Sequence, residues 1–233
     1  MAEEHGSDSD GVNPSFDPDA EYRVDRLPAS IALIACIVAF ILLPNSLVIK
    51  PKWLMPVLMA VALIPLAIAP RYRRANEYRW VRPLTIGLIA LINVANVISV
   101  ALLIHRQFWP NSSQQQDVHA LFWSGILIWI TNVIVFALWY WEIDRGGPAR
   151  RGTPEQRLPD FQFPQMENPK FAPKGWHPSF YDYAYVSFTN AAAFSPTDAM
   201  PLTRLVKGLM TFQSGVAMLT LIVIVGRAIN ILQ

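Results

Sequence analysis

Five long apolar segments constrain this chain more than any other feature of its sequence. Each approaches or exceeds the roughly 20 apolar residues that an α-helix needs to cross the hydrocarbon core of a bilayer. The chain has 233 residues, is 53% hydrophobic and only 15% charged, which is more apolar sequence than a soluble core of this size needs. The sequence therefore predicts a helical membrane protein with spans near residues 29–49, 53–69, 83–105, 118–141 and 201–231.

Composition divides the chain into four regions. Residues 1–27 hold eight acidic residues and no apolar period, which is typical of a disordered acidic tail. Residues 28–141 contain four of the predicted spans, and we expect the first two to form a tight helical hairpin. Residues 142–180 contain seven prolines and several aromatic residues, so this loop is expected to lie along the membrane surface or against the spans. Residues 181–231 contain a short polar segment and the last span.

Basic residues are distributed unevenly between the two sides that five spans define. Lys and Arg are retained on the cytoplasmic side of membranes. If the N-terminus is cytoplasmic, that side holds 15 of the 19 basic residues, and the other side keeps Lys50, Lys52, Arg106 and Arg227. The pattern predicts a cytoplasmic N-terminus. It also argues against nucleic acid as a partner, because the positive charge falls where membrane proteins place it.

A polar segment, YVSFTNAAAFSPTDAMPLT at residues 185–203, precedes the last span and is too short to cross a bilayer. The spacing of its YVSFT, Asp198 and PLT resembles the pore region of the potassium-channel superfamily, where a pore helix, a selectivity filter, an Asp and an inner helix follow one another. Laid on that pattern without gaps, AFSPTD at 193–198 occupies the places where the family reads TVGYGD. The sequence LIVIVGR at 221–227 is similar to the inner-helix end of small bacterial channels.

Together with the five apolar segments, this resemblance implies an all-α integral membrane protein with five transmembrane helices and one short re-entrant, pore-like helix before the last span. It also implies a homo-oligomer, a tetramer by analogy, because superfamily pores form around an axis shared by four copies. The pore-like site that it implies consists of Thr189, Asn190, Ala193, Phe194, Ser195, Pro196, Thr197 and Asp198.

The filter positions depart from the potassium-channel pattern. Ser195 and Thr197 replace the two glycines whose backbone angles allow successive carbonyls to face the ion. Pro196 fixes φ near −65°, and Ala193 lacks the hydroxyl of the family's first threonine. A potassium-selective filter is therefore not expected, and the charge count places the element on the cytoplasmic side, opposite to true channels. The whole pattern resembles a family of bacterial inner-membrane proteins of unknown function with such a degenerate pore.

The same residues also have structural interpretations. The small residues Ala191, Ala192 and Ala193 allow close packing of a re-entrant helix about as well as they allow a pore lining. Asp198, shortly before Pro201, is typical of a helix N-cap. The turn WEIDRGGP at 141–148 is expected to be a helix end with a local ion pair. Polar residues inside the spans are expected to form interhelical hydrogen bonds, namely Asn93, Asn96 and Asn132.

Enzyme motifs are absent from the sequence. The four histidines do not pair at metal-ligand spacing, and there is no nucleophile elbow or phosphate-binding glycine loop. We therefore expect no enzyme activity and no catalytic, cofactor or metal site. The leading hypothesis is a channel-like membrane protein that is not potassium-selective, surrounded by the lipid bilayer. The alternative is a non-conducting scaffold or partner-binding subunit that makes its contacts through the acidic tail and the proline-rich loop.

Overall fold

The chain is mostly helical, as the sequence predicted. The computed structural model describes residues 25–48, 51–68, 78–108, 118–151, 156–168, 170, 172–173, 176–195 and 198–231. The described part contains two strands of two residues each, β1 (Phe161–Gln162) and β2 (Met200–Pro201), and two short 3-10 helices, η2 (Asp144–Gly146) and η3 (Pro148–Arg150). The helices are α1 (Leu27–Leu42), α2 (Leu54–Ile68), α3 (Tyr78–Phe108), α4 (Val118–Ile143), α5 (Pro164–Glu167), α6 (Phe180–Ala192) and α7 (Arg204–Ile231).

Three helical stretches are long and apolar enough to cross a membrane, Arg82–Phe108, His119–Arg150 and Arg204–Ile229. They correspond to three of the five predicted spans, and they support an integral membrane protein. α1 and α2 are shorter, at 16 and 15 residues, and they pack against each other as the predicted hairpin.

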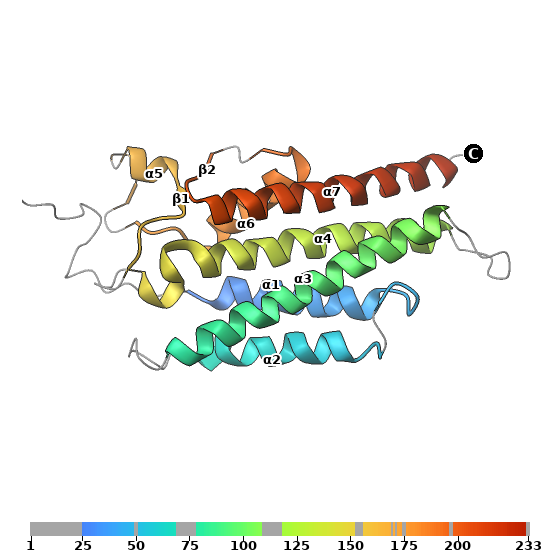
Figure 1. Cartoon of the computed structure of the whole chain (residues 1–233), viewed down its shortest axis with the longest axis horizontal. Coiled ribbons are helices and arrows are strands. Elements are labelled where there is room, and N and C mark those ends of the chain that lie inside the picture. The colour runs from blue at the N-terminus through green and yellow to red at the C-terminus, as the bar shows by residue number, and fades with distance from the viewer. Residues whose placement is uncertain are drawn as a thin grey trace, which may run out of the picture.

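Helix α4 is the centre of the bundle. It packs against α1, α3, α6 and α7, and Figure 1 shows the long helices lying side by side along one direction. The core contains large side chains from several of these helices, among them Phe40 of α1, Ile92 of α3 and Phe136 of α4, all at most 2% exposed. The packing of α4 against so many neighbours explains why its apolar residues surround the whole helix.

Helix α6 lies between two segments that meet at one end of the bundle. β1 precedes α6, β2 follows it, and the two strands pair antiparallel with Phe161 opposite Pro201. Figure 1 shows β1, β2 and α5 near the end where α4 finishes and α7 begins. The chain therefore enters α6 from this end and returns to the same end before α7.

Part of the proline-rich loop packs on the helices, as predicted for residues 142–180. Phe161 is fully buried, and its ring centroid lies 5.2 Å from that of Tyr140 in α4. Phe163 is also buried, 5.5 Å from the Tyr183 ring of α6. These edge-to-face contacts close the end of the bundle.

The N-cap of the last helix differs from the prediction. α7 begins at Arg204, and the hydroxyl of Thr203 accepts a hydrogen bond from the backbone N–H of Val206 at 3.4 Å. Asp198 lies six residues before the helix and is exposed, so the prediction that it caps the last span is wrong. The pairing of β2 with β1 holds residues 200 and 201 in an extended conformation, which moves the helix start beyond Asp198.

Candidate functional site

One face of α6 carries polar side chains that point into the bundle. Tyr183, Ser187 and Asn190 follow the spacing i, i+4 and i+7, which places them on the same side of a helix. All three are at most 3% exposed. The opposite face, with Tyr181, Tyr185 and Phe188, is exposed. α6 is therefore an amphipathic helix whose polar face is buried and whose aromatic face is exposed.

Hydrogen bonds join this face to α4 and α7. The Ser187 hydroxyl donates to the carbonyl of Val133 at 2.6 Å, and the Asn190 amide donates to the carbonyl of Met210 at 3.0 Å. Gln213 of α7 is the hub of the network: its Oε1 accepts from Asn190 at 2.8 Å and from the Tyr140 hydroxyl at 2.5 Å. We call the set Tyr140, Ser187, Asn190, Gln213 and Ser214 the amide cluster.

Both ends of the Gln213 amide are satisfied. Its Nε2 donates to the hydroxyl of Ser187 at 2.7 Å and to the backbone carbonyl of the same residue at 3.0 Å. Ser214 adds donations to Asn190 at 3.2 Å. Because unsatisfied polar groups are costly inside a bilayer, this network fixes α6 against α4 and α7.

The predicted pore-like residues divide between this cluster and the exposed end of α6. Asn190 belongs to the amide cluster, and Thr189 donates its hydroxyl to the Tyr185 carbonyl of its own helix at 3.0 Å. Ala193 ends the helix, and Phe194 has a left-handed backbone with φ of 55°. Ser195 and Asp198 are exposed, and Pro196 and Thr197 lie outside the described residues.

The small residues at the end of α6 are not all covered. Ala191 is fully buried, as expected for a close helix contact, but Ala192 and Ala193 are exposed. Of the two interpretations of these residues, close packing therefore applies to Ala191, whereas Ala192 and Ala193 are uncovered within one chain. The structure brings Thr189 and Asn190 into the packed interior, and it leaves the residues from Ala192 to Ser195 on the surface.

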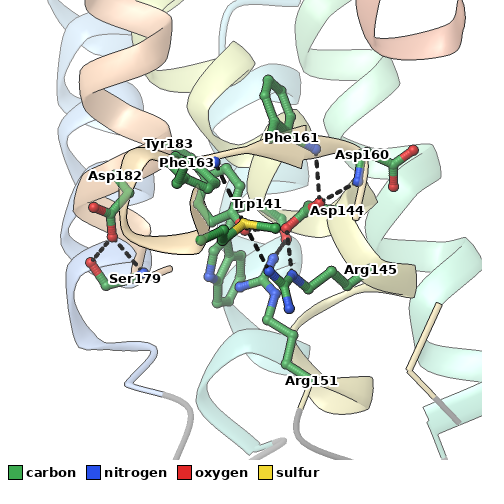
Figure 2. Close-up of polar contacts among 11 residues, drawn as sticks. Trp141, Asp144, Arg145, Arg151, Asp160, Phe161, Phe163, Ser179, Asp182 and Tyr183 are labelled. Atoms are coloured by element: carbon green, nitrogen blue, oxygen red, sulfur yellow. Dashed lines mark hydrogen bonds and ion pairs between the residues drawn. The ribbon is translucent and has the colours of Figure 1, made fainter. Parts of the chain in front are cut away.

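A second buried polar group lies at the end of α4. Asp144 is fully buried, and its Oδ1 accepts from the backbone N–H groups of Asp160 at 2.7 Å and Phe161 at 3.3 Å. Its Oδ2 accepts from the Tyr183 hydroxyl at 2.5 Å. Figure 2 shows these contacts converging on one carboxylate from the loop and from α6.

Two arginines accompany this carboxylate. Arg145 Nε lies 3.6 Å from Asp144 Oδ2, so the predicted local ion pair at this helix end is confirmed. Arg151, 1% exposed, donates to the backbone carbonyl of Trp141 and stacks over the Tyr183 ring with 4.9 Å between guanidinium carbon and ring centroid. We call Asp144, Arg145, Arg151 and Tyr183 the Asp144 cluster.

Asp160 extends the Asp144 cluster to α7. Its Oδ1 accepts from the Thr203 hydroxyl at 2.9 Å, and its backbone carbonyl accepts from Leu202 N–H at 2.8 Å. Burial raises the pKa of the Asp160 carboxyl, and the bond from Thr203 partly opposes that rise. The end of α4, the loop and the start of α7 are therefore connected through two carboxylates.

Three residues with positive φ form the turn after α4. Arg145, Gly146 and Gly147 have φ values of 56°, 82° and 100°. A Cβ on Gly147 would lie 3.2 Å from the Glu142 carbonyl oxygen and 3.3 Å from Arg82 Nε. The glycines therefore allow both the backbone angles and the close approach of arginine side chains.

Among the described residues, the asparagines within α3 and α4 do not form the interhelical hydrogen bonds that the sequence predicted. Asn96 and Asn132 are at most 1% exposed, yet within the described part of the chain neither amide has a hydrogen-bond partner. The Oδ1 atom of Asn93 is likewise without one there. The expected interhelical hydrogen bonds form instead at the amide cluster.

Sequence analysis missed most members of both clusters. A signal existed for the amide cluster, because Gln213 is a polar residue inside an apolar span and Ser187 and Asn190 share a helical face. No local signal pairs Asp144 with Tyr183, which lies 39 residues away.

Comparison with known proteins adds no assignment. No family model matches the chain, and neither a curated protein nor a solved structure matches it. In the described residues no group of three or more His, Cys, Asp or Glu side chains is placed to hold a metal ion.

Proposed function

We propose that this chain is a five-span integral membrane protein with a channel-like module formed by α6 and α7. α1 and α2 supply the two additional spans. At 1.5 Å per residue these helices extend about 24 and about 22 Å, which is shorter than a hydrocarbon core of about 30 Å. Residues flanking each helix add to that length, and Leu43, Leu47 and Val48 after α1 are buried.

In this proposal α6 is a re-entrant helix. Its Ser187 binds the carbonyl of Val133, ten residues before the end of α4 at Ile143. Ten residues of helix correspond to about 15 Å, or half of the hydrocarbon thickness. The return of the chain to β2 at the entry end supports the same geometry. The amide cluster supplies the internal partners that a helix ending at this depth requires.

The exposed end of α6 is the observation that carries the channel proposal. Ala192, Ala193, Phe194 and Ser195 are uncovered in one chain, directly after a helix held at membrane depth. A helix C-terminus carries a partial negative charge, which favours cations over anions near these residues. One chain cannot enclose a path there, so several copies around an axis would complete it.

Orientation follows from the charges at the two ends of the bundle. The end with the Asp144 cluster carries most of the described basic residues, whereas the other end of the long helices carries Arg106 and Arg227. In this proposal the end with the Asp144 cluster and the N-terminus lie on the cytoplasmic side of a bacterial inner membrane. Reporter fusions at residues 75, 112, 155 and 233 should report inside, outside, inside and outside. An outside signal at 155 would invert this orientation.

Ion flux into liposomes tests the channel proposal directly. Reconstituted protein should pass Na⁺ and K⁺ without preference, and Ala192→Leu should reduce that flux while leaving thermal unfolding in detergent unchanged. Ala101→Leu on the exposed surface of α3 is the matched control, and it should alter neither quantity. A strong preference for K⁺ over Na⁺ would contradict the argument from Ser195, Pro196 and Thr197.

A non-conducting scaffold is the second candidate. The polar groups of α6 at Ser187 and Asn190 are used within the chain, and the exposed face presents Tyr181, Tyr185 and Phe188. Such an aromatic face suits a protein contact better than an aqueous path. A stable oligomer that passes no ion under any gradient would favour this candidate over the channel.

A further inference from the structure

Two cavities lie in line on the side of the bundle formed by α3, α4 and α7. The larger has a volume of about 590 Å³ and the smaller about 300 Å³, and Trp139 of α4 lines both. Each volume falls within the range of small-molecule sites. Most of the α3 residues that line them are spaced three or four apart and form one continuous stripe, namely Arg82, Ile86, Ala90, Asn93 and Val97, and Val94 and Ile98 lie beside it.

The two cavities differ in polarity. The larger one opens at the end of the bundle near the Asp144 cluster, and it has Arg82, Arg157 and Asp160 among otherwise apolar and aromatic lining residues. The smaller one is apolar apart from Asn93, and the exposed ring of Phe212 forms its α7 wall. The groove therefore has a charged head and an apolar tail.

The charge of the head is positive. Arg82 Nε lies 3.9 Å from Glu142 Oε1, and Asp160 already accepts a hydrogen bond from Thr203. Arg150 and Arg157 approach the Gly146 turn from outside, because a Cβ there would lie 3.2 and 3.3 Å from their Cδ atoms. Among the residues that line the larger cavity, two arginines, Arg82 and Arg157, therefore accompany one carboxylate, Asp160, and Arg157 is exposed.

The groove reaches well into one leaflet. Its α3 wall rises twelve residues, or about 18 Å, from Ile86 in the larger cavity to Ile98 in the smaller one. One leaflet of a bilayer has a hydrocarbon depth of about 15 Å. The groove thus begins at the charged end of the spans and ends near the depth that a lipid chain reaches.

We propose that this groove binds one anionic phospholipid, with its phosphate held by Arg82 and Arg157 and an acyl chain along the apolar tail. Guanidinium groups bind phosphate oxygens with two parallel hydrogen bonds, and basic pockets between membrane helices suit such head groups. A zwitterionic lipid lacks the net charge that the head selects.

Lipid binding to the delipidated full chain in detergent tests this proposal. Dioleoyl phosphatidylglycerol should raise the unfolding temperature, whereas dioleoyl phosphatidylcholine should not. Native mass spectrometry should show retained phosphatidylglycerol. Arg157→Gln should weaken its binding about tenfold, because one charged hydrogen-bond donor group is lost. Ala90→Phe, which fills the tail, should weaken it as well.

Lys207→Gln is the matched control, since it removes one positive charge from an exposed site of α7 outside the two cavities. It should leave phosphatidylglycerol binding unchanged. Arg157 rather than Arg82 carries the test because Arg82 also lies beside the buried Glu142. Equal binding of both lipids, or equal loss in Lys207→Gln, would overturn the proposal. So would an equal thermal shift with water-soluble glycerol phosphate, or a dimer that covers the groove and excludes lipid.

Discussion

The amide cluster and the Asp144 cluster are both buried, and both hold α6 to the rest of the bundle, yet they use different chemistry. The amide cluster is neutral and lies within the spans, where Gln213 connects Tyr140, Ser187 and Asn190. The Asp144 cluster contains ionised side chains and lies where α4 ends and the chain turns. Burying charge costs far more than burying a neutral amide, and the cost rises with depth in a membrane.

The difference shows how this sequence distributes polar groups. Neutral side chains hold α6 against α4 and α7, because amides and hydroxyls can satisfy one another without a counter-ion. Charged side chains fix the loop at the bundle end, where one carboxylate accepts from two backbone N–H groups and from Tyr183. The two clusters should therefore respond differently to substitution and to pH.

Removing the buried carboxylate should have the largest effect. Asp144→Ala leaves Arg145 without its ion partner and leaves the Tyr183 hydroxyl without its acceptor. We expect a loss of about 3–5 kcal/mol in the free energy of unfolding, measured by denaturant titration in detergent. The control is Asp182→Ala, whose carboxylate accepts from the backbone N–H and the hydroxyl of Ser179 at the start of α6, and it should cost about 1 kcal/mol. Equal costs would mean that the Asp144 cluster does not organise this end.

The turn beside Asp144 should be the next most sensitive point. Gly147 has φ of 100° and ψ of 164°, a conformation that L-residues rarely adopt, and its Cβ would lie 3.2 Å from a backbone oxygen. Gly147→Ala should therefore cost about 1–3 kcal/mol. Gly208→Ala inside α7 should instead stabilise by about 0.5–1 kcal/mol, because nothing lies within 4 Å of its Cβ and helix propensity favours alanine. Thermal unfolding of both variants compares turn and helix directly, and a neutral Gly147→Ala would contradict the strain argument.

A substitution in the amide cluster should have a smaller effect. Asn190→Ala removes donations to Met210 and Gln213, while Gln213 Oε1 still accepts from Tyr140. Hydrogen bonds between membrane helices are modest in net value, so we expect a loss of about 1 kcal/mol. Ser214→Ala, with its 3.2 Å contacts, should cost less than Asn190→Ala in the same detergent assay. A cost for Asn190→Ala as large as for Asp144→Ala would remove the distinction between the clusters.

The positions of the long helices could be predicted from sequence because a membrane span leaves a local signal in about 20 residues. The start of α7 could not, since Thr203 and Asp198 are both good cap residues and the choice depends on the pairing of β2 with β1. That pairing joins segments 40 residues apart and consists of two residues on each strand, which leave no periodic pattern.

The amide cluster and the end of α6 could also be predicted only in part from the sequence. The helical spacing of Ser187 and Asn190 indicates a shared face, but the identity of the facing residues on α4 and α7 depends on how the helices pack. The exposure of Ala192 and Ala193 was not predictable either, because small residues suit a covered and an uncovered helix end equally well.

The smallest expected effect is the change in unfolding temperature on acidification, which should come from His177 beside the Asp144 cluster. Burial lowers the pKa of His177 from its ordinary value of 6.5, and the positive charges of Arg145 and Arg151 lower it further. The unfolded chain therefore binds a proton at His177 at a higher pH than the folded chain does. Stability from this group is complete above about pH 6.5 and is lost as the pH falls toward the folded pKa. Asp160 acts in the opposite sense, because its raised pKa lets the folded state hold a proton more tightly, but it is present in both proteins compared.

The unfolding temperature of the wild type, followed downward from pH 7.5, should fall more steeply than that of His177→Gln. If His177→Gln kept the wild-type slope, protonation beside the Asp144 cluster would contribute nothing, and the two clusters would differ in charge without differing in their response to pH.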